Sequence, residues 1–331
     1  MSTGRARIAI YWAAGCGGCE VAVVNIHEKL LDLDAAFELA FCPCLVDAKR
    51  HDVEAMADGE LALTFLDGAI RTSENEEMAR LLRRKSKLLV AMGACACTGG
   101  VPGLANLRGR GDLLELYGPT ASSDPASHQA PKTSWPVPGG TLELPEICER
   151  VRPVADLVDV DYFLPGCPPE SERIAEVLQL VIDGKPLPPK GSVVGAGRAS
   201  VCDQCARKPK GQTIEELSRA AFARPDDRCL LEQGLACVGP ATRDGCGALC
   251  PAVGVACAGC YGPPEGVADQ GARMAGAISA LLEVRSLHGL SEAELRAKVA
   301  ERLAQVPDWA GTFYKFSLPG SLLGRLKREG R

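Results

Sequence analysis

Short apolar runs alternate with charged, helix-like segments along the first half of the chain. Runs that predict buried strands occupy residues 7–12, 37–46, 61–66, 87–92 and 159–164. Segments with the periodicity of amphipathic helices occupy residues 20–33, 74–85 and 171–183. Strands that alternate with helices in this way are typical of a parallel sheet covered by helices, so the pattern predicts an α/β fold.

The second half of the chain has a different pattern. Residues 186–191 include three prolines and predict a linker, and residues 201–264 hold eight cysteines with few regular apolar repeats. A segment so poor in core residues needs internal staples, which metal clusters can supply. We therefore expect an α/β domain over residues 1–190, a cysteine-rich domain over residues 191–268 and a helical tail over residues 269–331.

Regular helices return in the tail, and a loop interrupts the first domain. Helical patterns span residues 270–282 and 291–303, and Ser291 with Glu294 forms the sequence signature of a capping box. Residues 118–140 are rich in Pro, Ser and Gly and predict a surface insertion.

The composition excludes several classes of protein. A net charge of −5 gives no basic surface for nucleic acid, and 5% aromatic residues are too few for stacking bases. No run approaches the roughly 18 apolar residues of a membrane span. No Gly-x-Gly-x-x-Gly motif follows the first predicted strand, so a dinucleotide site is not expected.

The sixteen cysteines are the outlying feature of the composition. The amino-terminal residues contain no apolar stretch of signal-peptide length, so we expect a reducing compartment. In such a compartment, clustered thiols are more often metal ligands than disulfides. None of the four histidines falls within a cysteine cluster, which disfavours mixed Cys/His zinc sites and favours thiolate-ligated iron.

Four cysteines of the first domain follow predicted strands, namely Cys16, Cys19, Cys95 and Cys167. In open α/β sheets, the carboxyl ends of the strands border a crevice where ligands bind, and a 4Fe-4S cluster needs four thiolates in one place. Cys16 and Cys19 alone also fit a thioredoxin-like redox pair, but that interpretation leaves Cys95 and Cys167 without a role.

The other cysteines of this domain are expected to be free thiols, because buried cysteine behaves as a small hydrophobe. They are Cys42, Cys44, Cys97 and Cys148.

Eight cysteines of the second domain form two further sets by spacing. One set contains Cys202, Cys205, Cys229 and Cys237, and the other contains Cys246, Cys250, Cys257 and Cys260. The spacing differs from the compact bacterial ferredoxin run, and paired C-x2-C motifs also suit Cys₄ zinc ribbons. Order along the chain does not decide which of these cysteines are grouped in space.

Three motifs of the first domain resemble the proximal-cluster motifs of nickel–iron hydrogenase small subunits. They are Cys16-Gly-Gly-Cys-Glu20, Gly93-Ala-Cys-Ala96 with Gly99-Gly100, and Pro165-Gly-Cys-Pro-Pro169. The motifs that resemble the cluster domain of the same family are Cys229-Leu-Leu-Glu-Gln-Gly234, Cys237-Val-Gly-Pro-Ala-Thr-Arg243 and Cys257-Ala-Gly-Cys260. The resemblance is greatest to the cytoplasmic, methyl-viologen-reducing type that works with heterodisulfide reductase.

The resemblance implies a flavodoxin-like first domain and three 4Fe-4S clusters that bind iron through twelve cysteines. The proximal cluster is assigned to Cys16, Cys19, Cys95 and Cys167. The distal cluster is assigned to Cys202, Cys205, Cys229 and Cys237, and the medial cluster to Cys246, Cys250, Cys257 and Cys260. The implied partners are a large subunit with the nickel–iron centre, a small iron–sulfur adaptor subunit and a heterodisulfide reductase-like complex.

Some residues depart from the pattern of membrane-bound relatives. Many of those relatives have histidine where this chain has Cys202, and a fourth thiolate adds negative charge that should lower the cluster potential. The chain shows no twin-arginine signal or carboxyl-terminal anchor, so the resemblance implies the cytoplasm. Asp67 follows a strand of the same sheet, and it stays a candidate carboxylate ligand in place of one thiolate.

We therefore expect an electron-transfer subunit of an oxidoreductase that acts on H₂, with no catalytic residue in this chain. Glu20 is either part of the large-subunit interface or a first-turn residue that complements the helix dipole. Residues 316–328, apolar and then basic, either dock on a partner or end a surface helix. Two alternatives stay open, a subunit of another oxidoreductase such as a complex I-like module, and a zinc-and-thiol scaffold.

Overall fold

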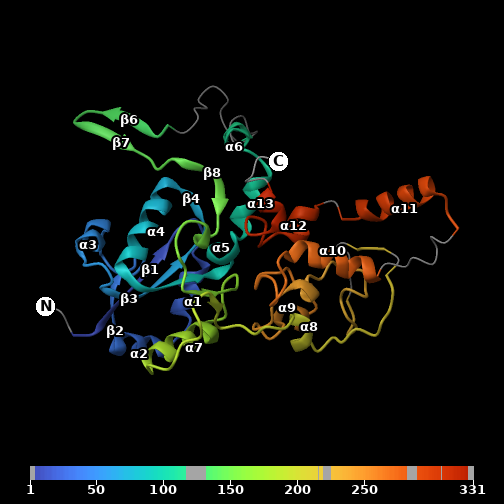
Figure 1. Cartoon of the computed structure of the whole chain (residues 1–331), viewed down its shortest axis with the longest axis horizontal. Coiled ribbons are helices and arrows are strands. Elements are labelled where there is room, and N and C mark those ends of the chain that lie inside the picture. The colour runs from blue at the N-terminus through green and yellow to red at the C-terminus, as the bar shows by residue number, and fades with distance from the viewer. Residues whose placement is uncertain are drawn as a thin grey trace.

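A six-stranded sheet, parallel throughout, forms the centre of the first domain (Figure 1). The computed structural model describes residues 4–116, 132–214, 216–218, 225–281, 289–306 and 308–326. The strand order is β10-β9-β5-β3-β1-β2. These strands are β1 (Ala6–Trp12), β2 (Phe37–Phe41), β3 (Leu61–Asp67), β5 (Ser86–Met92), β9 (Tyr162–Leu164) and β10 (Ser192–Val193). The predicted α/β class is confirmed.

Successive residues of the central strands point to opposite faces, and helices cover both faces. Ile8 and Ile10 pack with α1 (Gly18–Val24), α2 (Lys29–Ala36) and α7 (Ser171–Ile182). On the other face, the strands pack against α3 (Arg50–Ala55) and α4 (Ser73–Lys85). A strand buried on both sides has an almost continuous apolar sequence, which is why these strands were predictable.

The structure corrects several predicted boundaries. The single helix expected over residues 20–33 is wrong, because the chain breaks between α1 and α2, where His27 has a φ of +56°. The second strand ends at Phe41 rather than at residue 46, since Pro43 has no N–H to extend the ladder. The sheet also continues past residue 190, because β10 pairs with β9 after the proline-rich segment.

Smaller elements surround the sheet. They are β4 (Ile70–Thr72) paired with β8 (Ile147–Arg152), the hairpin β6 (Ser134–Val137) and β7 (Gly140–Glu143), α5 (Gly93–Thr98), η1 (Val101–Leu107), α6 (Arg110–Leu116) and η2 (Val154–Asp156). The hairpin is almost entirely exposed. It contains the end of the predicted surface insertion, of which residues 118–131 lie outside the described part of the chain.

The cysteine-rich part has little regular structure, as expected. Its elements are the four-residue helices α8 (Val201–Gln204) and α9 (Leu249–Ala252) and the short η4 (Gly239–Ala241). It shares a hydrophobic core with α10 (Gln270–Leu281) and α12 (Trp309–Phe313). The other two helices that follow are α11 (Glu292–Ala304) and α13 (Leu322–Leu326).

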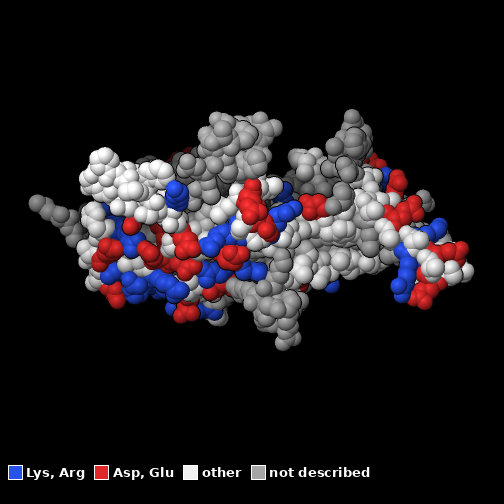
Figure 2. Space-filling view, turned by 90° about the horizontal axis from the view of Figure 1, so that it is seen from above, with Lys and Arg blue, Asp and Glu red and all other residues white. Residues whose placement is uncertain are grey.

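The capping box predicted for α11 is confirmed. The backbone N–H of Ser291 donates to Glu294 Oε2 at 2.9 Å, and the N–H of Glu294 donates to Ser291 Oγ at 3.4 Å. Charged side chains gather on α11, at one end of the molecule (Figure 2). On the same face, acidic and basic side chains are intermixed over the sheet domain, whereas the surface between the two regions carries few charges.

The carboxyl-terminal segment returns to the first domain just before α13 (Figure 1), where the N–H of Gly320 donates to the carbonyl of Thr98 at 3.3 Å. The hydroxyl of Thr98, at the end of α5, donates to the carbonyl of Phe316 at 2.6 Å. The predicted tail 316–328 therefore contacts its own chain through residue 316, and its last two residues lie outside the described ranges.

Candidate metal centre

Four cysteines meet at the carboxyl edge of the parallel sheet. Cys16 lies in the loop after β1, Cys19 in α1, Cys95 in α5 directly after β5, and Cys167 in the loop after β9. From β1 the chain continues to β2 on one side, whereas β3 pairs with β1 on the other side, so this edge contains a topological switch point. The structure thus brings the first predicted cysteine set to the edge where ligands bind in such sheets.

The thiol groups of this first group influence one another. Burial raises the pKa of Cys95 to about 12, and the nearby Cys167 and Cys16 add to the shift. Burial also raises the pKa of Cys19, with further contributions that include Cys95 and Cys167. Such thiols become thiolates when a metal ion replaces the proton, so metal binding here would release protons.

Glycines leave room for the sulfur atoms of this group. A Cβ on Gly93 would lie 2.5 Å from Cys19 Sγ, and a Cβ on Gly100 would lie 2.5 Å from Cys95 Sγ. Both glycines also have positive φ angles, +84° and +56°. Four soft sulfur donors in a space kept open by glycine fit a thiolate-ligated iron–sulfur cluster.

Two carboxyl groups lie beside the first group. Asp67, at the end of β3, is 2% exposed, and burial together with neighbouring Glu20 raises its pKa to about 9. Neither oxygen of the Glu20 carboxyl makes a hydrogen bond of normal geometry within the described residues, although it lies close enough to influence Asp67. Glu20 therefore belongs to the sulfur-rich edge as well as to the first turn of α1.

The second group of cysteines lines one cavity of about 200 Å³ in the cysteine-rich part. Cys202 comes from α8, and Cys205, Cys229 and Cys237 come from the loops around it. Burial raises the pKa of Cys202 to about 12, with additional contributions from the other three thiols. The cavity thus contains the whole predicted distal set.

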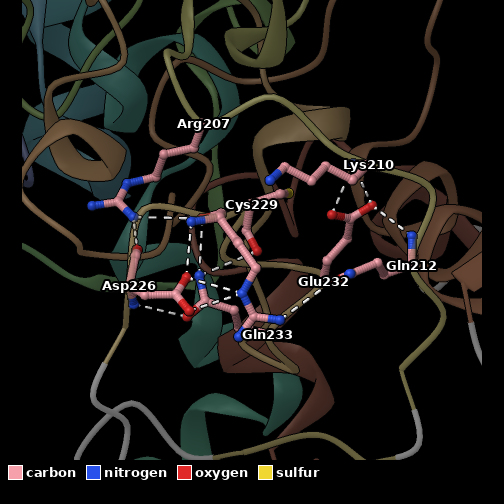
Figure 3. A network of polar contacts seen from close by, with 8 residues as sticks. Arg207, Lys210, Gln212, Asp226, Cys229, Glu232 and Gln233 are labelled. Atoms are coloured by element: carbon pink, nitrogen blue, oxygen red, sulfur yellow. Dashed lines mark hydrogen bonds and ion pairs between the residues drawn. The ribbon is translucent and has the colours of Figure 1, made fainter.

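Polar contacts hold the loops of this cavity in place (Figure 3). The side chain of Gln233 accepts from the N–H of Asp226 at 3.0 Å and donates to the carbonyl of Arg228 at 2.9 Å. Arg207, which lines the cavity, donates to the carbonyls of Pro251 and Asp226. These contacts connect the loop that carries Cys229 to the neighbouring loops.

The third group lies between the other two. Burial raises the pKa of Cys260 to about 12, and the nearby thiols of Cys246, Cys167 and Cys250 add to the shift, which a backbone hydrogen bond from Cys167 partly opposes. At the other end of the third group, the N–H of Cys257 donates to Sγ of Cys237, a member of the second group, at 3.3 Å. The third group therefore contacts the first through Cys260 and the second through Cys257.

Tyr261 connects the first and third groups, a role that the sequence did not indicate. Its side chain is 2% exposed, and its hydroxyl accepts from the N–H of Glu170, three residues after Cys167. Burial raises the pKa of this phenol, and Cys246 and Cys260 are among its neighbours. A single aromatic residue in an irregular loop has no periodicity that would have signalled this position.

The four remaining cysteines make no disulfide bonds. Cys42 is buried in the core and Cys44 is exposed. The thiol of Cys97 donates to the carbonyl of Ala91 at 3.3 Å, and that of Cys148 donates to Glu76 Oε1 at 3.3 Å. The prediction that these cysteines are free thiols agrees with these contacts.

A binding site for a single metal ion and a membrane-spanning helix are both absent from the described part of the chain. No three Cys, His, Asp or Glu side chains in the described ranges are arranged to bind a single metal ion. Within the same ranges, no helix combines the length and apolar character needed to cross a membrane.

Comparison with known proteins finds a family model that matches most of the first domain and relatives that match almost the whole chain. Residues 16–181 match the family model described as NADH ubiquinone oxidoreductase, 20 Kd subunit. The chain is 38% identical to the iron–sulfur subunit of the F420-non-reducing hydrogenase of Archaeoglobus profundus, over 96% of this chain and 98% of the relative. It is 36% identical to the corresponding subunit of the F420-non-reducing hydrogenase of Methanothermobacter marburgensis, over 98% of each chain.

The fold is also similar to a solved structure, the [NiFeSe]-hydrogenase of Dm. baculatum. The TM-score is 0.52 at 18% identity, with 80% of this chain and 96% of that chain covered. Matches that run nearly from end to end define the class of protein as the iron–sulfur small subunits of hydrogenases. Within this class, the chain belongs to the family of iron–sulfur subunits of the F420-non-reducing, methyl-viologen-reducing hydrogenases. The predicted family is confirmed, and the chain is a component of an oxidoreductase.

Proposed function

We propose that this chain relays electrons from H₂ through three 4Fe-4S clusters bound by its three cysteine groups. The observation that carries the proposal is the continuous row of cysteine groups, in which Cys260 lies near Cys167 and Cys257 contacts Cys237. When bound, such clusters supply one-electron redox chemistry, with potentials tuned by ligands, hydrogen bonds and burial.

The position of each group suggests its place in the relay. The first group, at the sheet edge, would be proximal to the partner that oxidises H₂, the third group medial, and the second group distal. The role of this chain is to hold each site by four thiolates. At the distal site, Cys202 supplies a fourth thiolate, whose charge favours the oxidised state of the site.

The relatives are named as hydrogenase subunits, which supports a hydrogenase partner for this chain. We propose that the partner at the proximal end is a large subunit with a nickel–iron centre. A small iron–sulfur adaptor and a heterodisulfide reductase-like complex would take the electrons at the distal end. We further propose a cytoplasmic location and three parts. They are a domain over residues 1–190 with the proximal cluster, whose sheet is completed by β10 just past this boundary, a domain over residues 191–268 with the other two clusters, and a helical tail over residues 269–331.

Metal analysis of this chain, purified anaerobically and separated from its partners, tests the cluster count. We expect about twelve irons per chain with matching acid-labile sulfide, since each of the three clusters contains four. Zinc without sulfide would instead support the zinc-and-thiol scaffold and exclude the relay.

The identity of the partner needs a separate test, because the matching family model takes its name from NADH ubiquinone oxidoreductase. We expect a nickel-containing subunit to co-purify with this chain, and the complex to reduce a dye with H₂. A complex that contains the clusters but has no nickel and no H₂-dependent activity would favour a complex I-like partner.

Replacement of one ligand tests the proximal assignment. A Cys167→Ser variant should lose the electron paramagnetic resonance signal of one cluster and keep the other two. Cys148→Ser is the matched control, since Cys148 lies outside the three groups and should leave all signals intact. Three unchanged clusters in Cys167→Ser would contradict the assignment of this residue.

A further inference from the structure

A buried carboxylate, Glu232, lies in the wall of the cavity that the second cysteine group lines. Glu232 is 6% exposed and stands three residues after Cys229. A carboxylate is rarely buried to this extent unless hydrogen bonds satisfy it. The groups that donate hydrogen bonds to Glu232 therefore indicate its role.

Three successive backbone amides donate to this carboxylate (Figure 3). The N–H of Lys210 lies 2.9 Å from both carboxylate oxygens, and the N–H groups of Gly211 and Gln212 lie 2.7 Å and 3.0 Å from Oε1. Gly211 has a φ of +77°, a conformation that turns consecutive N–H groups toward one anion. Backbone N–H donors stabilise negative charge, so the loop binds Glu232 as a carboxylate.

The loop held in this way is otherwise exposed. The side chains of residues 208–213 are exposed, but Pro209 and Arg207 line the same cavity as the cysteines. Arg207 donates to backbone carbonyls, and Lys208 donates to the carbonyls of Cys202 and Asp203. Neither of these two cations forms an ion pair with Glu232 in the described residues, and three backbone amides stabilise the charge of the carboxylate.

We propose that Glu232 is a positioning residue for the second cysteine group. Glu232 holds residues 210–212 beside the cavity, and its charge lowers the reduction potential of the cluster bound there. The inference rests on the proposed cluster at this group. Reduction adds an electron to the cluster, and a fixed negative charge close by disfavours that addition. Removal of the charge should therefore raise the potential of this cluster alone.

The test is a redox titration of the purified complex, followed by electron paramagnetic resonance, with a Glu232→Gln variant. The signal of the second cluster is identified by its loss in Cys229→Ser. We expect a higher midpoint potential for this cluster and unchanged potentials for the other two. Glu265→Gln is the matched control, because it removes the same charge from an exposed ion pair with Arg198, where solvent screens it.

Hydrogen exchange of the same complex tests the positioning directly. Residues 210–212 should exchange slowly in the unaltered chain and faster in Glu232→Gln and in Gly211→Ala, which strains the loop without a change in charge. An unchanged potential in Glu232→Gln with the cluster retained, or rapid exchange in the unaltered chain, would overturn the inference. Absence of any cluster from the second group of the unaltered chain would instead contradict the proposed function.

Discussion

Gly93 shows how a single residue controls the space around a sulfur atom. A Gly93→Ala variant places a Cβ 2.5 Å from Cys19 Sγ at a φ of +84°. We expect loss of the proximal cluster's signal, because Cys19 has to move, together with a cost of about 1–2 kcal/mol from the left-handed conformation. Iron content and electron paramagnetic resonance of the purified complex would measure the effect.

The control separates the collision from the backbone strain. Gly184 also has a positive φ, +60°, but a Cβ there meets nothing within 4 Å. Gly184→Ala should be destabilised to a similar extent and keep all clusters. If the two variants retain the same iron content, contact with Cys19 has no role in cluster binding.

At the scale of elements, Asp161 connects three parts of the sheet domain just before β9. Its carboxylate accepts from Arg83 of α4 at 2.6 Å and from the N–H of Leu89 of β5 at 2.8 Å, and it pairs with Lys190 before β10. Burial alone would raise the pKa of Asp161, but Lys190, Arg83 and Leu89 outweigh burial and lower it. The carboxylate is therefore more stable in the folded chain than in the unfolded chain.

An Asp161→Asn variant should lose about 2 kcal/mol of folding free energy at neutral pH, since hydrogen bonds to a charged group are lost. Because the folded pKa lies below the ordinary value of about 3.9, this contribution is complete above that value and is lost as the pH falls through the folded pKa. Thermal unfolding between pH 5 and 8 should show a constant difference between the variant and the unaltered chain. A difference that grew or shrank across this range would contradict the expected ionisation.

Among the helices and strands, sequence patterns were sufficient to predict some features and missed others. The buried strands were predictable because residues such as Leu61 and Leu89 belong to continuous apolar runs. The break after α1 was not, because it falls at His27 with a positive φ and no glycine or proline marks it. The network around Glu232 was missed because its partners are backbone amides, which leave no pattern of side chains.

For the whole molecule, the return of the carboxyl-terminal segment onto η1 joins the last part of the chain to the first. The ring of Pro319 lies so close to Gly103 that a Cβ there would be 2.3 Å from Pro319 Cγ. A Gly103→Ala variant should therefore displace this segment and cost about 1–3 kcal/mol, as overpacking does. Thermal unfolding of the purified complex and the protease sensitivity of the carboxyl-terminal residues would measure the change.

Gly111→Ala is the matched control for this contact. Gly111 lies in α6, and a Cβ there meets nothing within 4 Å, so alanine should be neutral or stabilise the helix by up to about 1 kcal/mol. If Gly103→Ala and Gly111→Ala are equally stable, Pro319 moves aside with no measurable loss of folding free energy.

The sequence by itself determined the parallel α/β sheet and the gathering of Cys16, Cys95 and Cys167 at one edge of it. Both follow from local rules, because parallel strands direct their carboxyl ends to the same side and each of these cysteines comes soon after a strand. Only the tertiary structure decided how the cysteine groups adjoin. Cys257 meets Cys237, and Cys260 lies near Cys167, through the packing of irregular loops whose paths no periodicity records.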